Sequence, residues 1–289
     1  MRKNSLTNCL QGYLRLVKYP LSLMVAFSAM TGYLLTGNTD SSVTLMLFSG
    51  VFFLAAGASG LNQVQERSFD ILMERTKNRP LPSNQISVVT ALAVSMILLI
   101  AGTLLLGYLG WLPLMLGLVN VVLYNLIYTP LKRITWLAII PGSLVGTVPP
   151  LIGWTSGGLS VFHPVILFVA VFVLLWQAPH FWLILIRYSR DYENAGFSRL
   201  PVCLDGNRIK NLVFLWALVT SGFLCSFPLF GLKFNSPLIA LFLLLNLLFI
   251  FFFYKFLFGK EVNQPIRKAF ILINSFAVAI LVLLIFGNH

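Results

Sequence analysis

The residues best suited to chemistry lie in one polar stretch, residues 62–82, which ends a long apolar segment. The stretch holds three of the eight carboxylates and four of the twenty Lys and Arg residues of the chain. Asn62, Glu66 and Asp70 recur every four residues, so on a helix they form one stripe about 12 Å long. Side-chain oxygens of this kind suit Mg²⁺, which usually shares its coordination with substrate phosphates. The spacing therefore favours a site for a magnesium-bound diphosphate.

Basic residues that could contact phosphate follow the stripe. Arg75 and Arg79 come directly after it, before a Pro-Leu-Pro stop, and guanidinium groups match the geometry of phosphate oxygens. Lys132 and Arg133 end a later apolar segment and could reach the same face. The alternative is an ordinary polar helix end with local charge pairing and basic anchors. The amide of Asn62 lies one turn deeper in the apolar run and faces the same way as the two acids. Its position favours a row of metal ligands over an ordinary polar helix end.

A second cluster ends another apolar segment. His180 follows a proline in the run 176–182, and Asp191 lies in the loop beyond it. His180 is a candidate ligand and Asp191 a candidate metal contact. The simpler interpretations are a histidine satisfied between helices and an acid on a surface loop.

The elements that must position these residues are membrane-spanning helices. Of the 289 residues 58% are hydrophobic and only 10% are charged, with a mean hydropathy of +0.89. This composition excludes a soluble globular domain and indicates an all-α polytopic membrane protein, because backbone groups in lipid must bond within each segment. Nine spans are expected, at about 20–36, 43–65, 86–106, 111–128, 134–153, 163–186, 211–231, 237–257 and 268–286.

The segments between these spans alternate in charge. One set holds nineteen of the twenty basic residues, and the opposite set holds only Lys233. The positive-inside rule then predicts a cytoplasmic N-terminus and an external C-terminus. All acids except Asp40 also fall on the cytoplasmic side, so we expect the active site there, in a bacterial inner membrane. This placement explains the net charge of +12 without a nucleic-acid partner.

Several motifs occur in an order and spacing that resemble the UbiA superfamily of membrane prenyltransferases, and within it the branch that acts on heme. The motifs are the stripe with Arg79–Leu81, then Tyr128–Arg133, Gly146–Trp154, Trp176–Phe181, and Asp191 and Tyr192 with Leu200–Val202. The resemblance implies that residues 1–289 form one prenyltransferase domain. Two departures are that Asp191 begins no DxxxD run and that Arg199 stands where an apolar residue is expected.

The resemblance also implies a reaction. Farnesyl diphosphate would alkylate a vinyl group of protoheme IX to give heme O and diphosphate, in a membrane and with Mg²⁺ as cofactor. Heme A synthase or oxidase assembly factors would be partners. The implied roles are metal binding by Asn62, Glu66, Asp70 and Asp191, diphosphate binding by Arg75, Arg79, Lys132 and Arg133, and heme or prenyl contact by His180, Tyr124, Tyr128 and Trp176.

Two other functions stay open. The chain could instead be a member of the same superfamily that prenylates another aromatic acceptor or a chlorin. A transporter with a polar gate is the alternative from another class, and it predicts charged or broken helices near the midplane of several spans.

Overall fold

The computed structural model describes residues 2–196, 206–259 and 264–287, and every regular element in these ranges is helical. Arg199 and the motif at 200–202 lie outside the described residues. The elements are α1 (Arg2–Leu16), α2 (Tyr19–Leu34), α3 (Ser41–Asp70), α4 (Val88–Leu109), α5 (Trp111–Val122), η1 (Leu123–Tyr128), α6 (Thr129–Ile134), η2 (Trp136–Ala138), α7 (Ile139–Ser156), α8 (Pro164–Arg187), α9 (Ser189–Asn194), α10 (Gly206–Leu224), η3 (Phe227–Phe230), α11 (Ser236–Phe258) and α12 (Pro265–Gly287).

Seven helical segments of the described chain are long and apolar enough to cross a membrane. They are α3, α4, the continuous run 111–134, the run 136–156, α8, α11 and α12. The first and seventh predicted spans correspond to α2, which has 16 residues, and to α10. Both lie in the same bundle although they fall outside that set. The predicted all-α membrane architecture is confirmed. Counting α2 and α10 with the seven candidate spans gives nine long helical segments in the described part of the chain.

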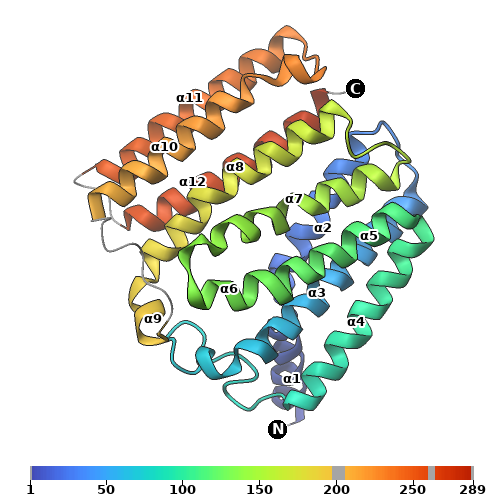
Figure 1. Cartoon of the computed structure of the whole chain (residues 1–289), viewed down its shortest axis with the longest axis vertical. Coiled ribbons are helices and arrows are strands. Elements are labelled where there is room, and N and C mark those ends of the chain that lie inside the picture. The colour runs from blue at the N-terminus through green and yellow to red at the C-terminus, as the bar shows by residue number, and fades with distance from the viewer. Residues whose placement is uncertain (1, 197–205, 260–263, 288–289) are drawn as a thin grey trace.

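The helices form a single array in which α8 lies between two groups (Figure 1). On one side α7 packs against α8 and α2, α2 packs against α3, and α3 packs along α4. On the other side α10 and α12 pack against α8, and α11 covers both. The connection 71–87, α1 and α9 gather at the same end of the bundle, while the C-terminus lies toward the opposite end (Figure 1).

Two glycines bring the backbones of α2 and α7 into contact. A Cβ atom at Gly153 would overlap the carbonyl of Ala29, and one at Gly32 would overlap the carbonyl of Pro150. Small residues allow such close approach between helices in a membrane. The α2–α7 pair is therefore a rigid wall on which side chains can be placed.

Local signals set both ends of α3. The Asp40 carboxylate accepts the backbone N–H groups of Ser42 and Val43 and so begins the helix. A hydrogen bond from the Ser42 hydroxyl is the main cause that keeps the pKa of Asp40 below its ordinary value, and the two backbone N–H donors add to it. The helix then runs 30 residues to Asp70, five residues beyond the predicted span that ended at 65. The whole acid stripe consequently lies on one continuous helix.

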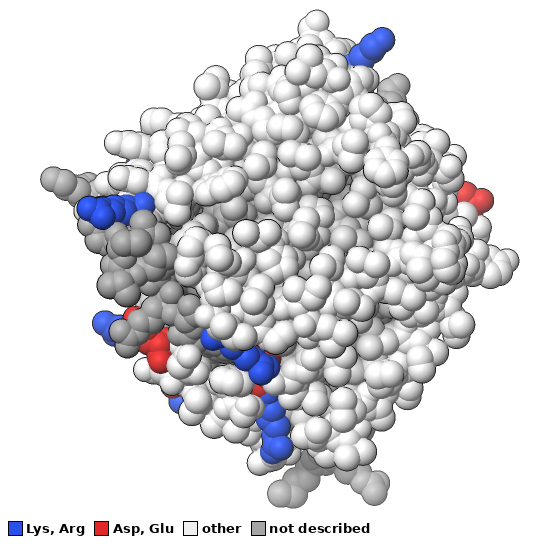
Figure 2. Space-filling view, viewed as in Figure 1, with Lys and Arg blue, Asp and Glu red and all other residues white. Residues whose placement is uncertain are grey.

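On the face shown in Figure 2, charged side chains lie at the margins of the bundle. In Figure 2 most of the blue and red side chains lie near the end that carries 71–87 and α9, and a wide uncharged surface covers the middle. Leu104, Leu247 and Phe251 are among the exposed apolar residues of the described helices. A surface of this kind matches lipid rather than water.

Candidate active site

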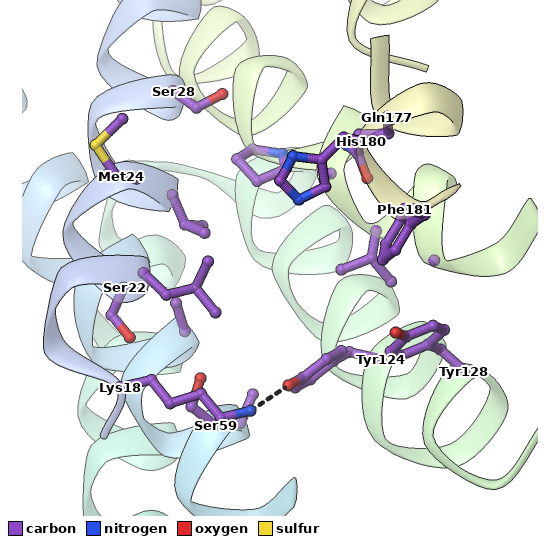
Figure 3. Close-up of a pocket in the computed structure, with 18 of the residues that line it drawn as sticks. Lys18, Ser22, Met24, Ser28, Ser59, Tyr124, Tyr128, Gln177, His180 and Phe181 are labelled. Atoms are coloured by element: carbon purple, nitrogen blue, oxygen red, sulfur yellow. Dashed lines mark hydrogen bonds between the residues drawn. The ribbon is translucent and has the colours of Figure 1, made fainter. Parts of the chain in front are cut away.

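A cavity of about 520 Å³ lies inside the bundle, between α2, α3, η1, α7, α8 and α12. One end is polar and the other is apolar and aromatic. Figure 3 shows Lys18 and Tyr124 facing each other across the polar end, with His180, Gln177 and Phe181 farther along the cavity.

The polar end carries more positive than negative charge. Four cationic side chains line it against two carboxylates. The cations are Lys18, Arg75, Arg79 and Lys132, and the carboxylates are Glu66 and Asp70. Because like charges enclosed in a low-dielectric site repel one another, this excess favours an anionic ligand.

Each of the two carboxylates is buried and has its own cationic partner. Asp70 is 3% exposed, and one Arg79 nitrogen donates to both of its oxygens, at 2.9 and 2.8 Å. Glu66 is 5% exposed, and its Oε1 lies 2.6 Å from Nζ of Lys132. The Thr76 hydroxyl donates to the Asp70 carbonyl at 2.9 Å and folds the connection 71–87 back over the end of α3. The structure therefore brings these four charges together at one end of the cavity.

The third member of the stripe, Asn62, is fully buried and contacts a residue that sequence reasoning did not select. Its Oδ1 accepts a hydrogen bond from Nζ of Lys18 at 2.8 Å. The same ammonium donates to the Tyr124 hydroxyl at 3.1 Å. Burial, and after it the charge of Arg79, lowers the pKa of Lys18 to about 8. The only sequence signal for Lys18 was its position directly before the first apolar run.

A π-helical segment aims two tyrosines at the cavity. Residues 123–128 form the π-helix η1, a rare feature that is frequently found at functional sites. Asn125 anchors η1 on α3, since its amide donates to the Ala58 carbonyl at 3.0 Å. Tyr124 and Tyr128 stack on the cavity side with ring centroids 5.9 Å apart.

Adjacent basic residues after η1 have different environments. Lys132 lines the cavity, whereas Arg133 donates to the Gln65 carbonyl at 2.7 Å and covers the ring of Phe69 at 4.6 Å. Arg133 is not among the residues that line the cavity. The predicted diphosphate contact of Arg133 has no geometric support, because its guanidinium packs α6 against α3.

His180 marks the apolar end. Its ring lies against Trp176, with centroids 5.1 Å apart, and against Phe270, at 4.8 Å. Its Nδ1 atom is buried without a hydrogen-bond partner among the described residues. Asn274 also lines this end. An imidazole nitrogen left without a partner inside an aromatic cage is free to bind a ligand.

The loop after α8 covers the polar end. The Asp191 carboxylate accepts the backbone N–H of Arg75 at 3.3 Å, and the Arg75 guanidinium lies 4.5 Å from the ring centre of Tyr188. Asp191 thus ties α9 to the connection 71–87. It does not line the cavity, and its role as a metal contact stays a prediction.

The cavity reaches the lipid-facing surface between α2 and α12. Leu21, Met24 and Val278 line it, yet they are 51%, 50% and 42% exposed. A hydrophobic molecule in the bilayer therefore has a route to the interior that does not cross the polar end.

The donor set at the polar end fits Mg²⁺ shared with a ligand. No group of three or more His, Cys, Asp or Glu side chains that could hold a metal occurs within 2–196, 206–259 and 264–287. Glu66 and Asp70 with the amide oxygen of Asn62 supply oxygen ligands from one helix face. Magnesium is usually bound in this way, by one or two carboxylates plus phosphate oxygens, and not by an all-protein cage.

Comparison with known proteins agrees with this geometry. The UbiA prenyltransferase family matches residues 25–284. A protoheme IX farnesyltransferase of Geobacter sulfurreducens is 39% identical over 216 residues, which are 73% of this chain and 78% of the relative.

Solved structures share the fold. A digeranylgeranylglyceryl phosphate synthase has a TM-score of 0.76 at 20% identity, covering 97% of this chain and 98% of its own. A UbiA homologue from Archaeoglobus fulgidus bound to GPP and Mg²⁺ has a TM-score of 0.70 at 16% identity, with 94% and 99% covered. The chain therefore belongs to the UbiA prenyltransferase family and is a multi-pass membrane prenyltransferase.

Proposed function

We propose that this enzyme transfers the farnesyl group of farnesyl diphosphate to a vinyl group of protoheme IX. The allylic C–O bond breaks, a C–C bond forms to the vinyl carbon, and water supplies the hydroxyl of a hydroxyethylfarnesyl side chain. The products are heme O and diphosphate. The observation that carries this proposal is the division of one cavity into a cationic end with two carboxylates and an apolar, aromatic end. The name of the Geobacter relative supports the same acceptor.

The polar end would bind and stabilise the leaving group. Arg75, Arg79 and Lys132 line the cavity and would contact the diphosphate oxygens, so that negative charge developing on them meets preorganised positive charge. Asn62, Glu66 and Asp70 would hold Mg²⁺, and a bound Mg²⁺ supplies further neutralisation of the departing diphosphate. The GPP and Mg²⁺ bound to the Archaeoglobus homologue support the use of a divalent metal by this enzyme.

The stacked tyrosines would separate the two ends. Tyr124 and Tyr128 line the cavity opposite Lys18, and Phe181 and His180 lie farther along it (Figure 3). Aromatic faces stabilise nearby positive charge, and a dry wall limits attack by stray water on the allylic carbon. Phe181, 6.0 Å from Tyr128 between ring centres, extends this wall toward His180.

The apolar end would hold the acceptor. Nδ1 of His180, which has no hydrogen-bond partner in the described part of the chain, would bind heme as an axial ligand, or contact a propionate or water, with Trp176 against the imidazole face. The apolar parts of both substrates would enter from the bilayer between α2 and α12, where exposed apolar side chains line the cavity. We further propose a bacterial inner membrane with a cytoplasmic N-terminus and active site, and delivery of the product to heme A synthase or an oxidase assembly factor.

Expression in a bacterial strain that lacks heme O synthase tests the proposal. We expect extracted hemes to contain heme O by mass spectrometry, and the Asp70→Ala variant to yield protoheme IX alone at equal membrane abundance. If the wild-type chain prenylates a hydroxybenzoate or a chlorin in an acceptor screen and leaves protoheme IX unchanged, the proposed acceptor is wrong.

A further inference from the structure

Each oxygen ligand of the α3 stripe is paired with a different cation. The Asn62 amide oxygen, the Glu66 carboxylate and the Asp70 carboxylate are contacted by Lys18, Lys132 and Arg79, at 2.8, 2.6 and 2.8 Å. A metal ion that bound this stripe would compete with all three contacts. Two of the contacts are ion pairs, but the one made by Lys18 is not.

The Lys18 ammonium has neutral hydrogen-bond partners. It donates to the Asn62 amide at 2.8 Å and to the Tyr124 hydroxyl at 3.1 Å. An internal cation without a carboxylate partner at hydrogen-bond distance is poorly compensated for the loss of water. Its backbone is also unusual for a lysine, with a φ of 46° in the left-handed region at the junction of α1 and α2. Strained positions of this kind persist where the surrounding structure requires them, often at functional sites.

The orientation of the Asn62 amide is fixed independently. The Thr129 hydroxyl donates to the Tyr124 carbonyl at 2.8 Å, so its oxygen accepts the Asn62 Nδ2–H group at 3.0 Å. The Oδ1 atom of Asn62 must then face Lys18, the side from which a metal would be bound. While Lys18 donates to this oxygen, the positive charge of its ammonium opposes the binding of a metal ion to the same atom.

From these contacts we propose that Lys18 is a placeholder for the divalent cation: its ammonium occupies the metal side of Asn62 and would move to the diphosphate when the metal binds. The inference rests on the proposed metal–diphosphate site and adds Lys18 to it as a positioning residue. The four-carbon stem of lysine permits the movement. The positive charge of Lys18 opposes a metal and attracts a diphosphate, so its removal has opposite effects on the two ligands.

The test measures the two ligands separately on purified full-length protein in detergent. Binding of Mn²⁺ is followed by its electron paramagnetic resonance signal without diphosphate, and binding of inorganic pyrophosphate is measured by calorimetry in EDTA. In Lys18→Met we expect Mn²⁺ to bind about tenfold more tightly and pyrophosphate about tenfold more weakly, because one charge at close range is lost. The control Lys77→Met removes a 46% exposed lysine paired with Glu74, and both affinities should stay unchanged.

A second variant retains the charge and guards against misfolding of the first. Tyr124→Phe removes one of the two acceptors of the ammonium, so Mn²⁺ should bind about threefold more tightly while pyrophosphate binding is unchanged. Weaker Mn²⁺ binding in both variants, or unchanged affinities in both, would overturn the placeholder role. A wild-type protein that binds neither probe would instead refute the metal–diphosphate site of the proposed function.

Discussion

The two ends of the cavity satisfy their polar groups in opposite ways. At the polar end the candidate ligands Asn62, Glu66 and Asp70 are each paired with a cation inside the protein. At the apolar end, Nδ1 of His180 is buried among aromatic rings without a hydrogen-bond partner in the described chain. The candidate ligands at the polar end are therefore already contacted by cations, while the apolar end presents an imidazole nitrogen without a hydrogen-bond partner among the described residues.

This difference teaches how the two substrates would be recognised. A charged ligand at the polar end must exchange existing ion pairs, so its affinity depends on replacing each of them. A large aromatic ligand at the other end only has to satisfy one nitrogen and fill apolar space, which favours shape over charge. The contributions of charge at the polar end and of shape at the apolar end can be separated by substitutions. Some should affect one end, some both ends and some neither.

The largest effect is expected at the polar end. Asp70→Asn keeps the shape of the side chain but removes the charge that Arg79 contacts, so transfer should fall by about 10²–10³-fold. Protoheme IX binding should be unchanged, because the apolar end is untouched. Turnover and heme titration of purified protein measure both quantities. Glu74→Gln, which changes an acid that is 76% exposed, is the matched control, and wild-type turnover in Asp70→Asn contradicts the metal role.

A substitution at the apolar end should have the reverse pattern. His180→Ala removes the imidazole whose Nδ1 has no hydrogen-bond partner in the described chain, and protoheme IX should bind about tenfold more weakly because a buried contact is lost. Pyrophosphate binding should match wild type. His163→Ala is a suitable control, since this histidine begins α8 by accepting the Val165 N–H and does not line the cavity. Unchanged heme binding in purified His180→Ala would exclude the ligand role.

A change in the α2–α7 wall should lower the stability of the bundle that holds both ends of the cavity. In Gly153→Ala the new Cβ atom meets the Ala29 carbonyl, a backbone atom that cannot turn away. We expect a loss of about 1–3 kcal/mol in the free energy of unfolding, seen as a lower thermal midpoint in detergent. Gly222→Ala places a Cβ in open space and should leave the midpoint unchanged. Equal stability of the two variants would contradict the close packing.

The smallest effect is expected far from both ends. Asn235 begins α11 by accepting the Leu238 N–H at 3.1 Å, so Asn235→Ala should cost about 1 kcal/mol of stability. Neither ligand affinity should change. Asn235→Asp keeps the cap and should restore the thermal midpoint, and a shift in either affinity would mean that the ends are coupled through the whole bundle.

Much of this arrangement could be predicted from the sequence. The four-residue spacing of Asn62, Glu66 and Asp70 predicted one helical face because 3.6 residues form each turn, and α3 extends through all three. Charge alternation and hydropathy predicted the helical membrane bundle, which depends only on the cost of polar groups in lipid.

The remaining features depend on tertiary contacts that no local pattern encodes. Lys18 resembled a basic anchor before an apolar run, and only the packing of α1 and α2 turns its ammonium toward Asn62. Lys132 and Arg133 are neighbours in sequence, but the packing of their helix against α3 places Lys132 beside Glu66 and Arg133 beside the Gln65 carbonyl. Asp191 was selected for its charge, whereas its carboxylate contacts a backbone N–H.

The most direct test of the account combines both ends in one reaction. Purified wild-type protein is incubated with farnesyl diphosphate, protoheme IX and Mg²⁺, and the hemes and released pyrophosphate are quantified by mass spectrometry and a coupled assay. We predict hydroxyethylfarnesyl heme and pyrophosphate in equal amounts, no product in EDTA, and recovery when Mg²⁺ is restored. Unmodified protoheme IX beside farnesylation of another acceptor, or an undiminished yield in EDTA, would contradict the account.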